Sequence, residues 1–524
     1  MSVLGAIATP HALATQAGVR AYADGGNAID AALAAAAMLT VVYPHQCAIG
    51  GDLMALLDDG AGMLCCVNGS GAAAARASSS VLRSRYSEMP DSGPDSITVP
   101  GLVAGWQSLH GLGARLSVAR LLDPAIAAAS DGVAVSTSLA AGIRYRGARL
   151  LERPAIGALF MPDGVPLAQG ALLRQPQLAR TLRSLAADGL GAFYTGAIGA
   201  CLVSGLGRLG SCLTAADFAA HRSELSTPLR LEHRGAQIHT SPPNSQGFAL
   251  LEAITALDAL GIAIEPLGNA APWLLRAQRM AAEDRDRYLG DPRRVSVPLT
   301  ELLAPSVLRE RLSARIAGRA WPAASPVSVP AHGDTVAVCA MDSTGVAVSL
   351  IQSLYQSFGS TVLEPVTGVI FHNRGRGFSL VPGAANEFVP GTRPAHTLSP
   401  VLIHRDGRVL AVLGTMGGRA QPQILAQLIP GIFEAGASLA AVLSAPRWVM
   451  GARDIDFDRP TVAIEADAPE PLDTALRIED LDIARIPARN ERVGHAQLIT
   501  VGPDGVLQAA SDPRSDGAAE VWRR

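Results

Sequence analysis

The sequence predicts a mixed α+β fold in which helices dominate the N-terminal part and strands open the C-terminal part. Three observations support this prediction. Helical patterns separated by Gly and Pro turns recur between residues 110 and 290. A Pro-rich segment, 317–333, has no periodicity, and two apolar hairpin patterns follow it. The 524 residues suffice for several domains or one large layered unit.

The N-terminal region predicts a buried helix followed by a strand. Asn27 is a candidate N-cap, and the apolar run from Ala31 to Val42 is too short to span a bilayer, which favours a core helix. The sequence "AIGGD" at 48–52 predicts a tight turn before the strand.

The middle region predicts further helices joined by loops. The segments "SVARLLDPAIAAASDG" and "TAADFAAHR" have helical patterns, whereas "VPGLVAGW" and "SPPNSQG" are rich in Gly and Pro and are typical of loops.

After the segment 317–333, which we interpret as a linker, the sequence predicts a hairpin buried on both faces. Both "TVAVCAM" and "VAVSLI" are apolar throughout, and "DSTG" separates them. With the turn centred between Ser343 and Thr344, antiparallel pairing puts Thr335 opposite Gln352 and next to Ser353.

A second hairpin is predicted within "HTLSPVLIHRDGRVLAVLG", with Asp406 and Gly407 at its turn. It leads into "LGTMGGRAQPQILAQLI", which predicts a strand, a glycine turn and a helix.

Composition and charge argue against several function classes. The net charge is −3 without long runs of one sign, which predicts no nucleic-acid partner and no membrane partner. The N-terminus does not resemble a secretory signal, and we expect a cytoplasmic protein with buried free thiols. The spacing of the six cysteines does not match a zinc site, and we expect no metal. The cysteines are Cys47, Cys65, Cys66, Cys201, Cys212 and Cys339.

Thr335 is a candidate nucleophile. A Thr hydroxyl needs an adjacent base, and the α-amine of a chain that begins with Thr provides one. Cleavage between Asp334 and Thr335 exposes that amine at the start of a buried strand. The alternative is an ordinary strand Thr, and spacing alone does not separate the two interpretations.

The segment from Asp334 to Ser360 resembles the processing site of the γ-glutamyltransferase family of N-terminal nucleophile hydrolases. Ordered matches extend over nearly the whole chain: "GGNAIDAALAA", "VPGLVAGW", "PPNSQG", "AEDRDRYLGDP", "TRPAHTLSP", "GTMGG", "GHAQ" and "SDPRSDGAA". The resemblance implies a four-layer αββα sandwich built from two chains of one self-cleaved precursor. These are a large chain, 1–334, and a small chain, 335–524, which stay together as a heterodimer.

The resemblance also implies catalytic roles. Thr335 is the nucleophile and attacks an amide carbonyl to form an acyl-enzyme. Ser353 corresponds to a family Thr that hydrogen-bonds the nucleophile. Gly417 and Gly418 match a glycine pair whose N–H groups stabilise the oxyanion. No metal or organic cofactor is implied.

Several positions depart from the γ-glutamyl-specific pattern. Where those members have an Arg for the substrate α-carboxylate, this chain has Gly69 or a neighbour, and the nearby Arg76 is displaced by several residues. An acidic pair is replaced by Arg376 and Gly377, and a serine pair by His396 and Thr397. The loop 378–393 is too short to hold the family's lid.

These departures predict a different, anion-binding pocket for a small-molecule amide. The candidate substrate-binding residues are Tyr355, Arg374, Arg376, His396 and Thr397. For Tyr355, Arg374, Arg376 and His396, a surface or core role is an equally good interpretation.

The chain resembles a lid-less branch of the family that includes oxamate amidohydrolase and glutaryl-type cephalosporin acylases. We therefore expect hydrolysis of a small carboxylate-bearing amide, with oxamate a candidate. The alternatives are a glutathione hydrolase or γ-glutamyltransferase, a glutaryl-type acylase, and a non-catalytic binding protein. The Gly-rich turns do not fit GxGxxG, which argues against an oxidoreductase.

Overall fold

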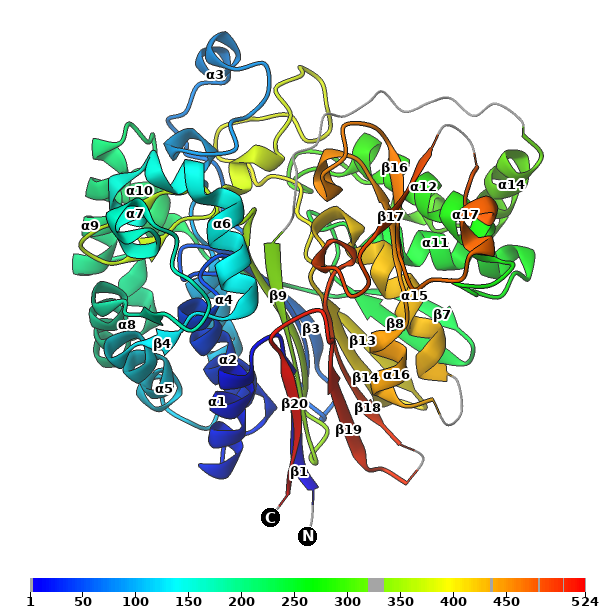
Figure 1. The fold of residues 1–524 in the computed structure, drawn as a ribbon, viewed down its shortest axis with the longest axis horizontal. Helices are drawn as coiled ribbons and strands as arrows, with labels where there is room; N and C mark the ends of the chain where they lie inside the picture. Colours follow the sequence, from blue (N-terminus) through cyan, green and yellow to red (C-terminus); the bar gives the residue numbers. More distant parts are fainter. Residues whose placement is uncertain (1–2, 319–333, 434–436, 479–480, 503, 524) are drawn as a thin grey trace.

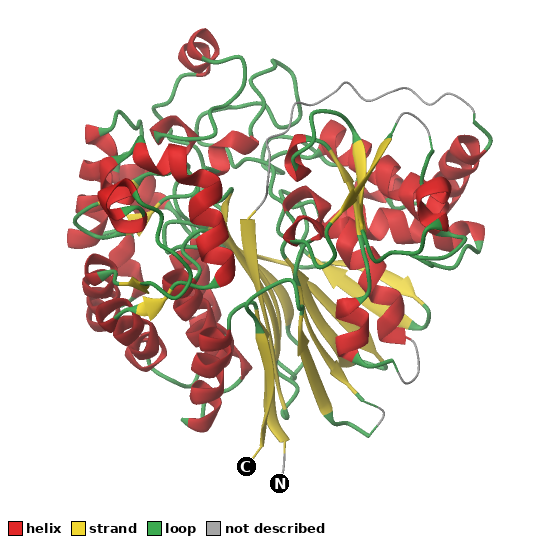
Figure 2. Ribbon diagram, viewed as in Figure 1, coloured by secondary structure: helices red, strands yellow, loops and turns green. Residues whose placement is uncertain are grey.

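The protein is a stack of four layers in which two β-sheets lie face to face between two layers of helices. The computed structural model describes residues 3–318, 334–433, 437–478, 481–502 and 504–523. Figure 2 shows the strands in the centre with helices on both sides. The αββα sandwich and the mixed α+β class expected from the sequence are confirmed.

The first sheet has seven strands, and its neighbouring pairs are all antiparallel. In spatial order the strands are β20 (Ala518–Arg523), β1 (Val3–Thr9), β9 (Asp334–Asp342), β10 (Ala347–Tyr355), β2 (Asp52–Asp58), β3 (Leu64–Asn68) and β6 (Glu224–Ser226). Three neighbouring pairs in this sheet, β20 with β1, β1 with β9, and β10 with β2, join a strand that begins before Asp334 to one that begins at or after it, so backbone hydrogen bonds join the two parts of the chain.

The second sheet has six strands and is also antiparallel. Its spatial order is β19 (Leu507–Ser511), β18 (Ala496–Val501), β14 (Arg408–Thr415), β13 (Val401–Arg405), β8 (Ala236–Thr240) and β7 (Leu229–His233). Three smaller sheets accompany it: β15 (Trp448–Gly451) with β16 (Thr461–Glu465) and β17 (Asp482–Ile486), β11 (Leu363–Glu364) with β12 (Val369–Ile370), and β4 (Val133–Ala134) with β5 (Leu172–Leu173).

Helices from the N-terminal half cover the outer face of the seven-stranded sheet (Figure 1). They are α1 (Ala12–Ala23), α2 (Ala28–Val42), α4 (Leu102–Gly111), α5 (Val118–Asp131), α6 (Thr137–Leu151), α7 (Pro154–Phe160), α8 (Pro176–Asp188), α9 (Gly196–Arg208) and α10 (Ala215–Ala220). The short helix α3 (Ser79–Arg85) projects at the top of Figure 1.

The six-stranded sheet is covered by α11 (Gly247–Leu260), α12 (Ala271–Tyr288), α14 (Pro305–Ile316), α15 (Gln421–Phe433), α16 (Leu439–Ser444) and α17 (Pro471–Ala475). The short helix α13 (Leu299–Leu302) precedes α14. The 3₁₀ turns are η1 (Pro94–Ser96), η2 (Pro162–Gly164), η3 (Leu190–Phe193), η4 (Arg374–Gly377), η5 (Gly418–Ala420), η6 (Arg453–Ile455) and η7 (Glu491–Val493).

A separate hydrophobic cluster holds each pair of layers together. The largest packs the seven-stranded sheet against the N-terminal helices, and the second packs the six-stranded sheet against α11, α12, α14 and α15. A smaller cluster between the sheets contains Cys339 and Met341 of β9 with Val409 and Val412 of β14. Because β9 and β10 lie inside this stack, all but one of their residues are buried, as the apolar sequence predicted.

The register of the central hairpin differs by one residue from the prediction. Thr335 pairs with Ser353, and Val336 pairs with Gln352. The turn contains an odd number of residues between Met341 and Ala347, because the Asp342 side chain caps it and Gly345 adopts a positive φ of 96°. The shift brings Thr335 and Ser353 directly opposite each other.

Several local predictions are confirmed. Asn27 caps α2 and forms a capping box with Asp30. The turn "AIGGD" leads directly into β2, and Asp406 and Gly407, both with positive φ, join β13 to β14. The glycine turn and helix after β14 are also present, as η5 and α15.

Three local predictions need correction or lie outside the description. The segment "VPGLVAGW" is not all loop, since α4 begins at Leu102 and packs on β2. Cys212 is exposed and Cys201 is half-buried, whereas the other four thiols are buried as expected. Of the predicted linker, Ala317 and Gly318 form a turn directly after α14, and 319–333 lie outside the described residues.

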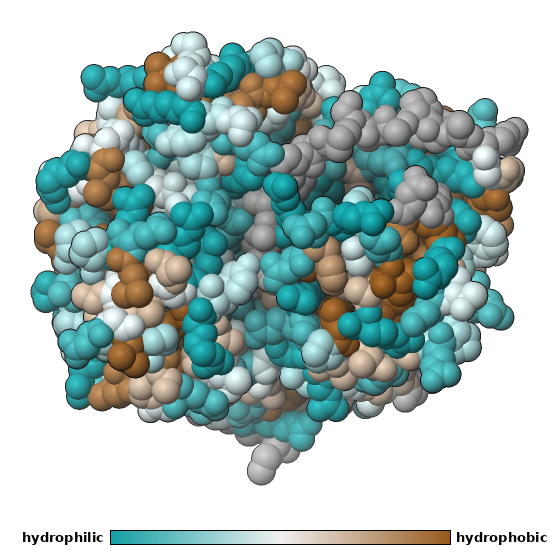
Figure 3. All heavy atoms as spheres, turned by 45° about the horizontal axis from the view of Figure 1, so that its top comes forward, coloured by the Kyte–Doolittle hydropathy of each residue, from teal (hydrophilic) through white to brown (hydrophobic). Residues whose placement is uncertain are grey.

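The segment Leu190–Arg208 is long and apolar enough to cross a membrane by composition. It is not one continuous helix, because η3 ends at Phe193 and α9 begins at Gly196, which has a φ of 73°. Figure 3 shows a mostly polar face of the molecule on which hydrophobic residues form small, separate groups.

Candidate active site

The Thr335 hydroxyl lies in a short chain of hydrogen bonds at the start of β9. Its Oγ1 donates to Ser353 Oγ over 3.0 Å, and Ser353 Oγ donates to the Asp334 carbonyl oxygen over 2.6 Å. The Tyr355 N–H donates to the same serine oxygen over 2.8 Å. One serine therefore holds both the Thr335 hydroxyl and the carbonyl of the peptide bond before Thr335. Thr335 is only 1% exposed.

The glycine pair lies at the same end of the hairpin. Val412 packs near Cys339 and Met341, and a Cβ placed on Gly414 lies 3.0 Å from the Ala337 side chain. Strand β14 therefore runs toward Thr335, and Gly417 and Gly418 follow just beyond its end. Among the described residues, neither glycine N–H has a hydrogen-bond acceptor, so both remain available as donors.

A cavity of about 380 Å³, called the Tyr355 cavity here, lies beside this end of the hairpin. Four of the predicted substrate-binding residues line it: Tyr355, Arg376, His396 and Thr397. The wall combines charged side chains with the apolar Leu289, Phe378 and Leu380. The structure thus brings these four residues together around one space.

Arg374 does not line the Tyr355 cavity. It is 1% exposed, and its guanidinium carbon lies 4.1 Å from the centre of the Tyr355 ring. Its Nε is 3.7 Å from Asp52, and no guanidinium nitrogen has a hydrogen-bond acceptor among the described residues. Arg374 therefore packs against the Tyr355 ring without lining the cavity itself. Direct contact of Arg374 with substrate stays a prediction.

Asp52 is fully buried beside Arg374 and was not singled out by the sequence. Burial raises the pKa of Asp52 to about 7, and the nearby Arg374 guanidinium opposes part of this rise. The only signal for Asp52 was its place directly after the "AIGGD" glycines, which predicts a turn and not a charge cluster.

His396 is held in one orientation by this cluster. Its Nδ1 accepts from the Thr397 N–H over 3.1 Å, so its Nε2 carries the proton and donates to Asp52 over 3.3 Å. Burial lowers the pKa of His396 well below its usual value, and the Arg374 charge lowers it further. His396 is therefore a neutral hydrogen-bond donor to Asp52.

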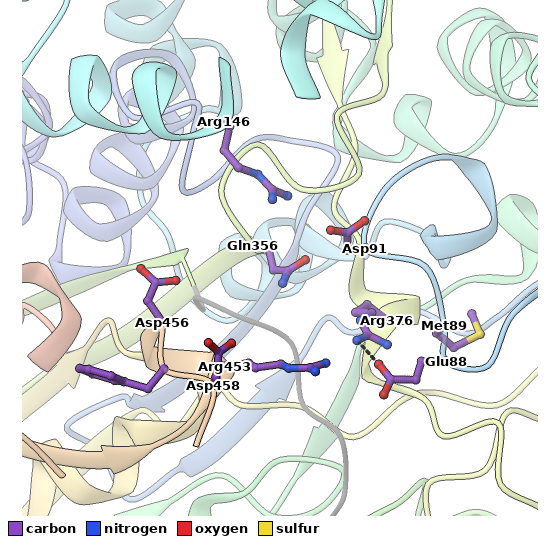
Figure 4. A pocket seen from close by; sticks show the side chains of 10 residues that line it. Glu88, Met89, Asp91, Arg146, Gln356, Arg376, Arg453, Asp456 and Asp458 are labelled. Carbon is purple, nitrogen blue, oxygen red and sulfur yellow. Dashed lines mark hydrogen bonds and ion pairs between the residues drawn. The ribbon is translucent and has the colours of Figure 1, made fainter. Parts of the chain in front are cut away.

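Arg376 lies between the Tyr355 cavity and a second cavity of about 500 Å³. It forms an ion pair of 2.7 Å with Glu88, which also lines both cavities. Figure 4 shows the pair on one side of the second cavity, with Arg453, Asp456 and Asp458 facing it and Gln356 between them. Arg376 is thus partly neutralised.

Sequence reasoning missed a polar group that joins the cavity wall to the glycine pair. Gln246 Nε2 donates to the carbonyls of Thr397 and Gly418 over 3.0 and 2.8 Å. Arg285 binds Gln246 and Asp286, and Arg419 forms an ion pair with Asp286. Gln246 was within the quoted "PPNSQG" motif, but nothing in the sequence shows that it reaches both segments.

Two of the positions at which we predicted a departure from the γ-glutamyl-specific pattern, Gly69 and Arg76, lie outside the lining of the Tyr355 cavity. Arg76 is exposed and does not line the Tyr355 cavity. At Gly69, an added Cβ would lie 2.7 Å from the Gly101 carbonyl oxygen, so no larger side chain fits there without a shift. That this segment provides no arginine for a substrate α-carboxylate stays a prediction.

The family model of gamma-glutamyltranspeptidase matches residues 14–522. The chain belongs to the gamma-glutamyltranspeptidase family. Oxamate amidohydrolase proenzyme from Klebsiella pneumoniae subsp. pneumoniae is 35% identical over 526 residues, covering 99% of this chain and 98% of that protein. The glutathione hydrolase-like YwrD proenzyme from Bacillus subtilis is also 35% identical and covers 99% of both chains.

Among solved structures of the gamma-glutamyltranspeptidase family fold, cephalosporin acylase from Bacillus halodurans superposes with a TM-score of 0.89 at 30% identity. The match covers 100% of this chain and 96% of the acylase. The relatives are proenzymes of hydrolases, so the expected amidohydrolase of N-terminal nucleophile type is confirmed at the level of the family. The identity of its amide is a separate question.

Proposed function

We propose that the chain cleaves itself between Asp334 and Thr335 and then hydrolyses a small carboxylate-bearing amide, with oxamate the first candidate. The observation that most supports self-cleavage is the hydrogen-bond chain from Thr335 Oγ1 through Ser353 Oγ to the Asp334 carbonyl. It places the nucleophile, a hydroxyl relay and the bond to be cut on three adjacent groups.

The proposed hydrolysis uses the amine that self-cleavage creates. The Thr335 α-amine accepts the hydroxyl proton while Oγ1 bonds to the substrate carbonyl carbon. The Gly417 and Gly418 N–H groups stabilise the oxyanion, and the amine returns the proton to the departing nitrogen as the C–N bond breaks. Water then attacks the ester, and the carboxylic acid leaves Thr335 free again. No cofactor takes part in these steps.

The two products of self-cleavage remain associated in this proposal. Strand β9 lies between β1 and β10, and β10 pairs with β2, so strands from 1–334 flank strands from 335–524. In the second sheet β8 pairs with β13 across the same division. Cutting one peptide bond leaves these strand pairs between the two parts in place, which gives the expected heterodimer.

The charges around the Tyr355 cavity support an anionic substrate. Arg285, Arg376 and Arg419 line it together with Asp286 and Glu88, so cations outnumber anions by one. A guanidinium binds a carboxylate with two parallel hydrogen bonds. Oxamate has one carboxylate next to its amide. One relative, at 35% identity, is named an oxamate amidohydrolase proenzyme.

A second candidate is a larger, glutaryl-type acyl group. The Tyr355 cavity has an apolar wall formed by Leu289, Phe378 and Leu380, and a volume of about 380 Å³. An acyl group with a methylene chain would use that wall, whereas oxamate leaves it uncovered. The likeness to a cephalosporin acylase supports the same candidate.

Intact-mass spectrometry of the purified wild type, Thr335→Ala and Thr335→Ser tests self-cleavage. We expect two fragments that meet at Asp334 and Thr335 in the wild type, the same fragments in Thr335→Ser, and one uncut chain in Thr335→Ala. A single uncut wild-type chain after prolonged incubation contradicts the proposal. Uncut Thr335→Ala beside a cleaved wild type identifies the hydroxyl as the nucleophile.

A substrate panel then distinguishes the candidates on the cleaved enzyme. Oxamate, glutaryl amides and glutathione are compared by kcat/KM, with acetamide as the uncharged control. Preference for oxamate supports the first candidate, preference for glutaryl amides supports the second, and equal rates on acetamide contradict an anion-binding pocket.

We also propose, from composition alone, that the enzyme acts in the cytoplasm.

A further inference from the structure

A third cavity, of about 270 Å³, lies outside the candidate active site and shares no lining residue with the Tyr355 cavity. We call it the Thr98 cavity. Its walls come from the loop before α3, from α3 itself, from the segment 94–98, and from the loop between α9 and α10. Gly375 and Phe388 complete it. Its volume lies below the roughly 300 to 1,000 Å³ typical of ligand pockets, so its occupant is small.

The inner wall of the Thr98 cavity is apolar. Ala73, Ala74, Leu82, Ile97, Leu213 and Phe388 line it and are all buried. Most of these side chains are small or aliphatic, so the walls suit a short hydrocarbon chain.

One polar group within this apolar wall lacks a partner. Thr98 is 1% exposed, and its hydroxyl has no hydrogen-bond partner among the described residues. A buried hydroxyl without a partner costs free energy, because it has lost its hydrogen bonds to water. A ligand with an oxygen at this position would supply the missing bond.

The rim of the cavity has one uncompensated positive charge. Arg85 is paired with Asp95 at 3.5 Å, and both line the cavity. Arg76 also lines it, is exposed, and forms no ion pair or side-chain hydrogen bond with any described residue. An apolar space with one free guanidinium at its rim complements a molecule with one negative charge and a short apolar chain.

We propose that the Thr98 cavity binds a small monocarboxylate whose apolar chain lies against Leu82, Ile97 and Phe388. The carboxylate pairs with Arg76 at the rim. If the apolar chain of the ligand carries an oxygen atom, that oxygen forms a hydrogen bond with the Thr98 hydroxyl. This site is additional to the proposed catalytic one, and it does not depend on which amide the enzyme hydrolyses.

The position of the cavity links it to the candidate active site. An added Cβ on Gly375 would lie 2.7 Å from the Ser96 carbonyl oxygen, so the segments 94–98 and 374–377 are in close contact. The second segment carries Arg374, which supports Tyr355, and Arg376, which lines the Tyr355 cavity. A bound ligand therefore contacts the turn that holds both arginines.

Cys212 provides a direct test, because it lines the Thr98 cavity and is exposed. The rate at which iodoacetamide alkylates Cys212 is measured by peptide mass spectrometry, with and without hexanoate as the ligand. The half-buried Cys201 in the same molecule is the internal control. We expect hexanoate to slow alkylation of Cys212 in a saturable way and to leave Cys201 unchanged. The uncharged 1-hexanol protects only at higher concentration.

Two variants complete the test. Arg76→Gln removes the free charge and raises the hexanoate concentration needed for half protection by about fivefold. Arg309→Gln removes the same charge from an exposed position on α14 and leaves protection unchanged. The proposal is overturned if hexanoate gives no protection, if 1-hexanol protects equally well, or if both variants behave alike. Because alkylation is measured and not turnover, an inactive enzyme does not affect the result.

Discussion

Two buried charge clusters in this molecule differ in how completely they are hydrogen-bonded. In the first, Arg514 donates from all three guanidinium nitrogens, to Asp512, Glu465 and two backbone carbonyls. In the second, Arg374 lies 3.7 Å from Asp52 and donates to no described residue. Both arginines are almost fully buried.

The carboxyl groups of the two clusters respond in opposite directions. Burial alone raises the pKa of Asp512, but the guanidiniums of Arg447 and Arg514 outweigh it and hold the pKa below its ordinary value. At Asp52, burial dominates and raises the pKa to about 7. The first cluster joins β15 and β16 to β18 and β19 and is structural: all three guanidinium nitrogens of Arg514 are hydrogen-bonded, and Arg447 lacks an acceptor among the described residues only at Nε. The second retains free donors beside Tyr355, as expected for a group with a role at the site.

The largest expected effect comes from removing a charge from the first cluster. Asp512→Asn leaves the buried Arg447 without its charge partner and lowers the free energy of unfolding by about 3 to 5 kcal/mol. Urea unfolding is measured in a Thr335→Ala background, so that one uncut chain is compared throughout. The control is Asp123→Asn, whose exposed pair with Arg20 is worth less than about 1 kcal/mol. Equal losses in the two variants contradict a structural role for the first cluster.

The second prediction uses the pH dependence of Asp52. Its pKa is raised in the folded state, so the folded protein binds the Asp52 proton more tightly than the unfolded chain does. This contribution to stability is present at low pH and is lost as the pH rises through about 7. In the same Thr335→Ala background, wild-type Asp52 therefore loses a few kcal/mol relative to Asp52→Asn between about pH 4 and pH 7.

Above pH 7 the difference between the two chains levels off, because Asp52 is then ionised in both states. Asp512→Asn controls for the method, since the pKa of Asp512 is lowered and its titration falls at lower pH. A difference between Asp52 and Asp52→Asn that stays constant with pH contradicts the raised pKa.

The same contrast explains what the sequence could predict. Regular elements with clear local signals were predicted: the Asn27 cap of α2, the Asp406 and Gly407 turn, and the doubly buried strands around Thr335. The helix α4 was missed because Gly101 and Gly105 suggest a loop, whereas close packing against Gly69 and Leu53 requires glycine at these positions. Local propensity gave way there to tertiary packing.

At the site, hairpin geometry brought Ser353 near Thr335, but the sequence could not fix the register to one residue. The resemblance supplied the four-layer fold and the glycine pair. Asp52 and Gln246 were missed, since their partners lie on segments far apart in the chain. Whether Arg374 faces substrate or supports Tyr355 depends on the path of η4, which no local pattern encodes. Burial and charge pairing are properties of the assembled layers.

A third, smaller effect separates the two arginines of η4. Arg376 lines the Tyr355 cavity, so Arg376→Gln raises KM for an anionic amide about tenfold with little change in kcat. The values come from steady-state assays on oxamate or the best glutaryl amide, with acetamide as the uncharged substrate. Arg453→Gln removes a charge from the neighbouring cavity only and is the matched control. Equal KM changes in the two variants contradict a carboxylate contact by Arg376.

The smallest expected effect concerns Glu88, which neutralises Arg376 across 2.7 Å. The Glu88 side chain is 36% exposed, so water screens this pair and its removal changes little in stability. Glu88→Gln frees the guanidinium for substrate and lowers KM for an anionic amide about two- to threefold. Asp91 lines the second cavity together with Glu88 but forms no ion pair with Arg376, so Asp91→Asn leaves KM unchanged. If Glu88 acts through Arg376, its substitution has no effect on KM in an Arg376→Gln background, whereas an unchanged effect in that double variant means that Glu88 acts on substrate directly.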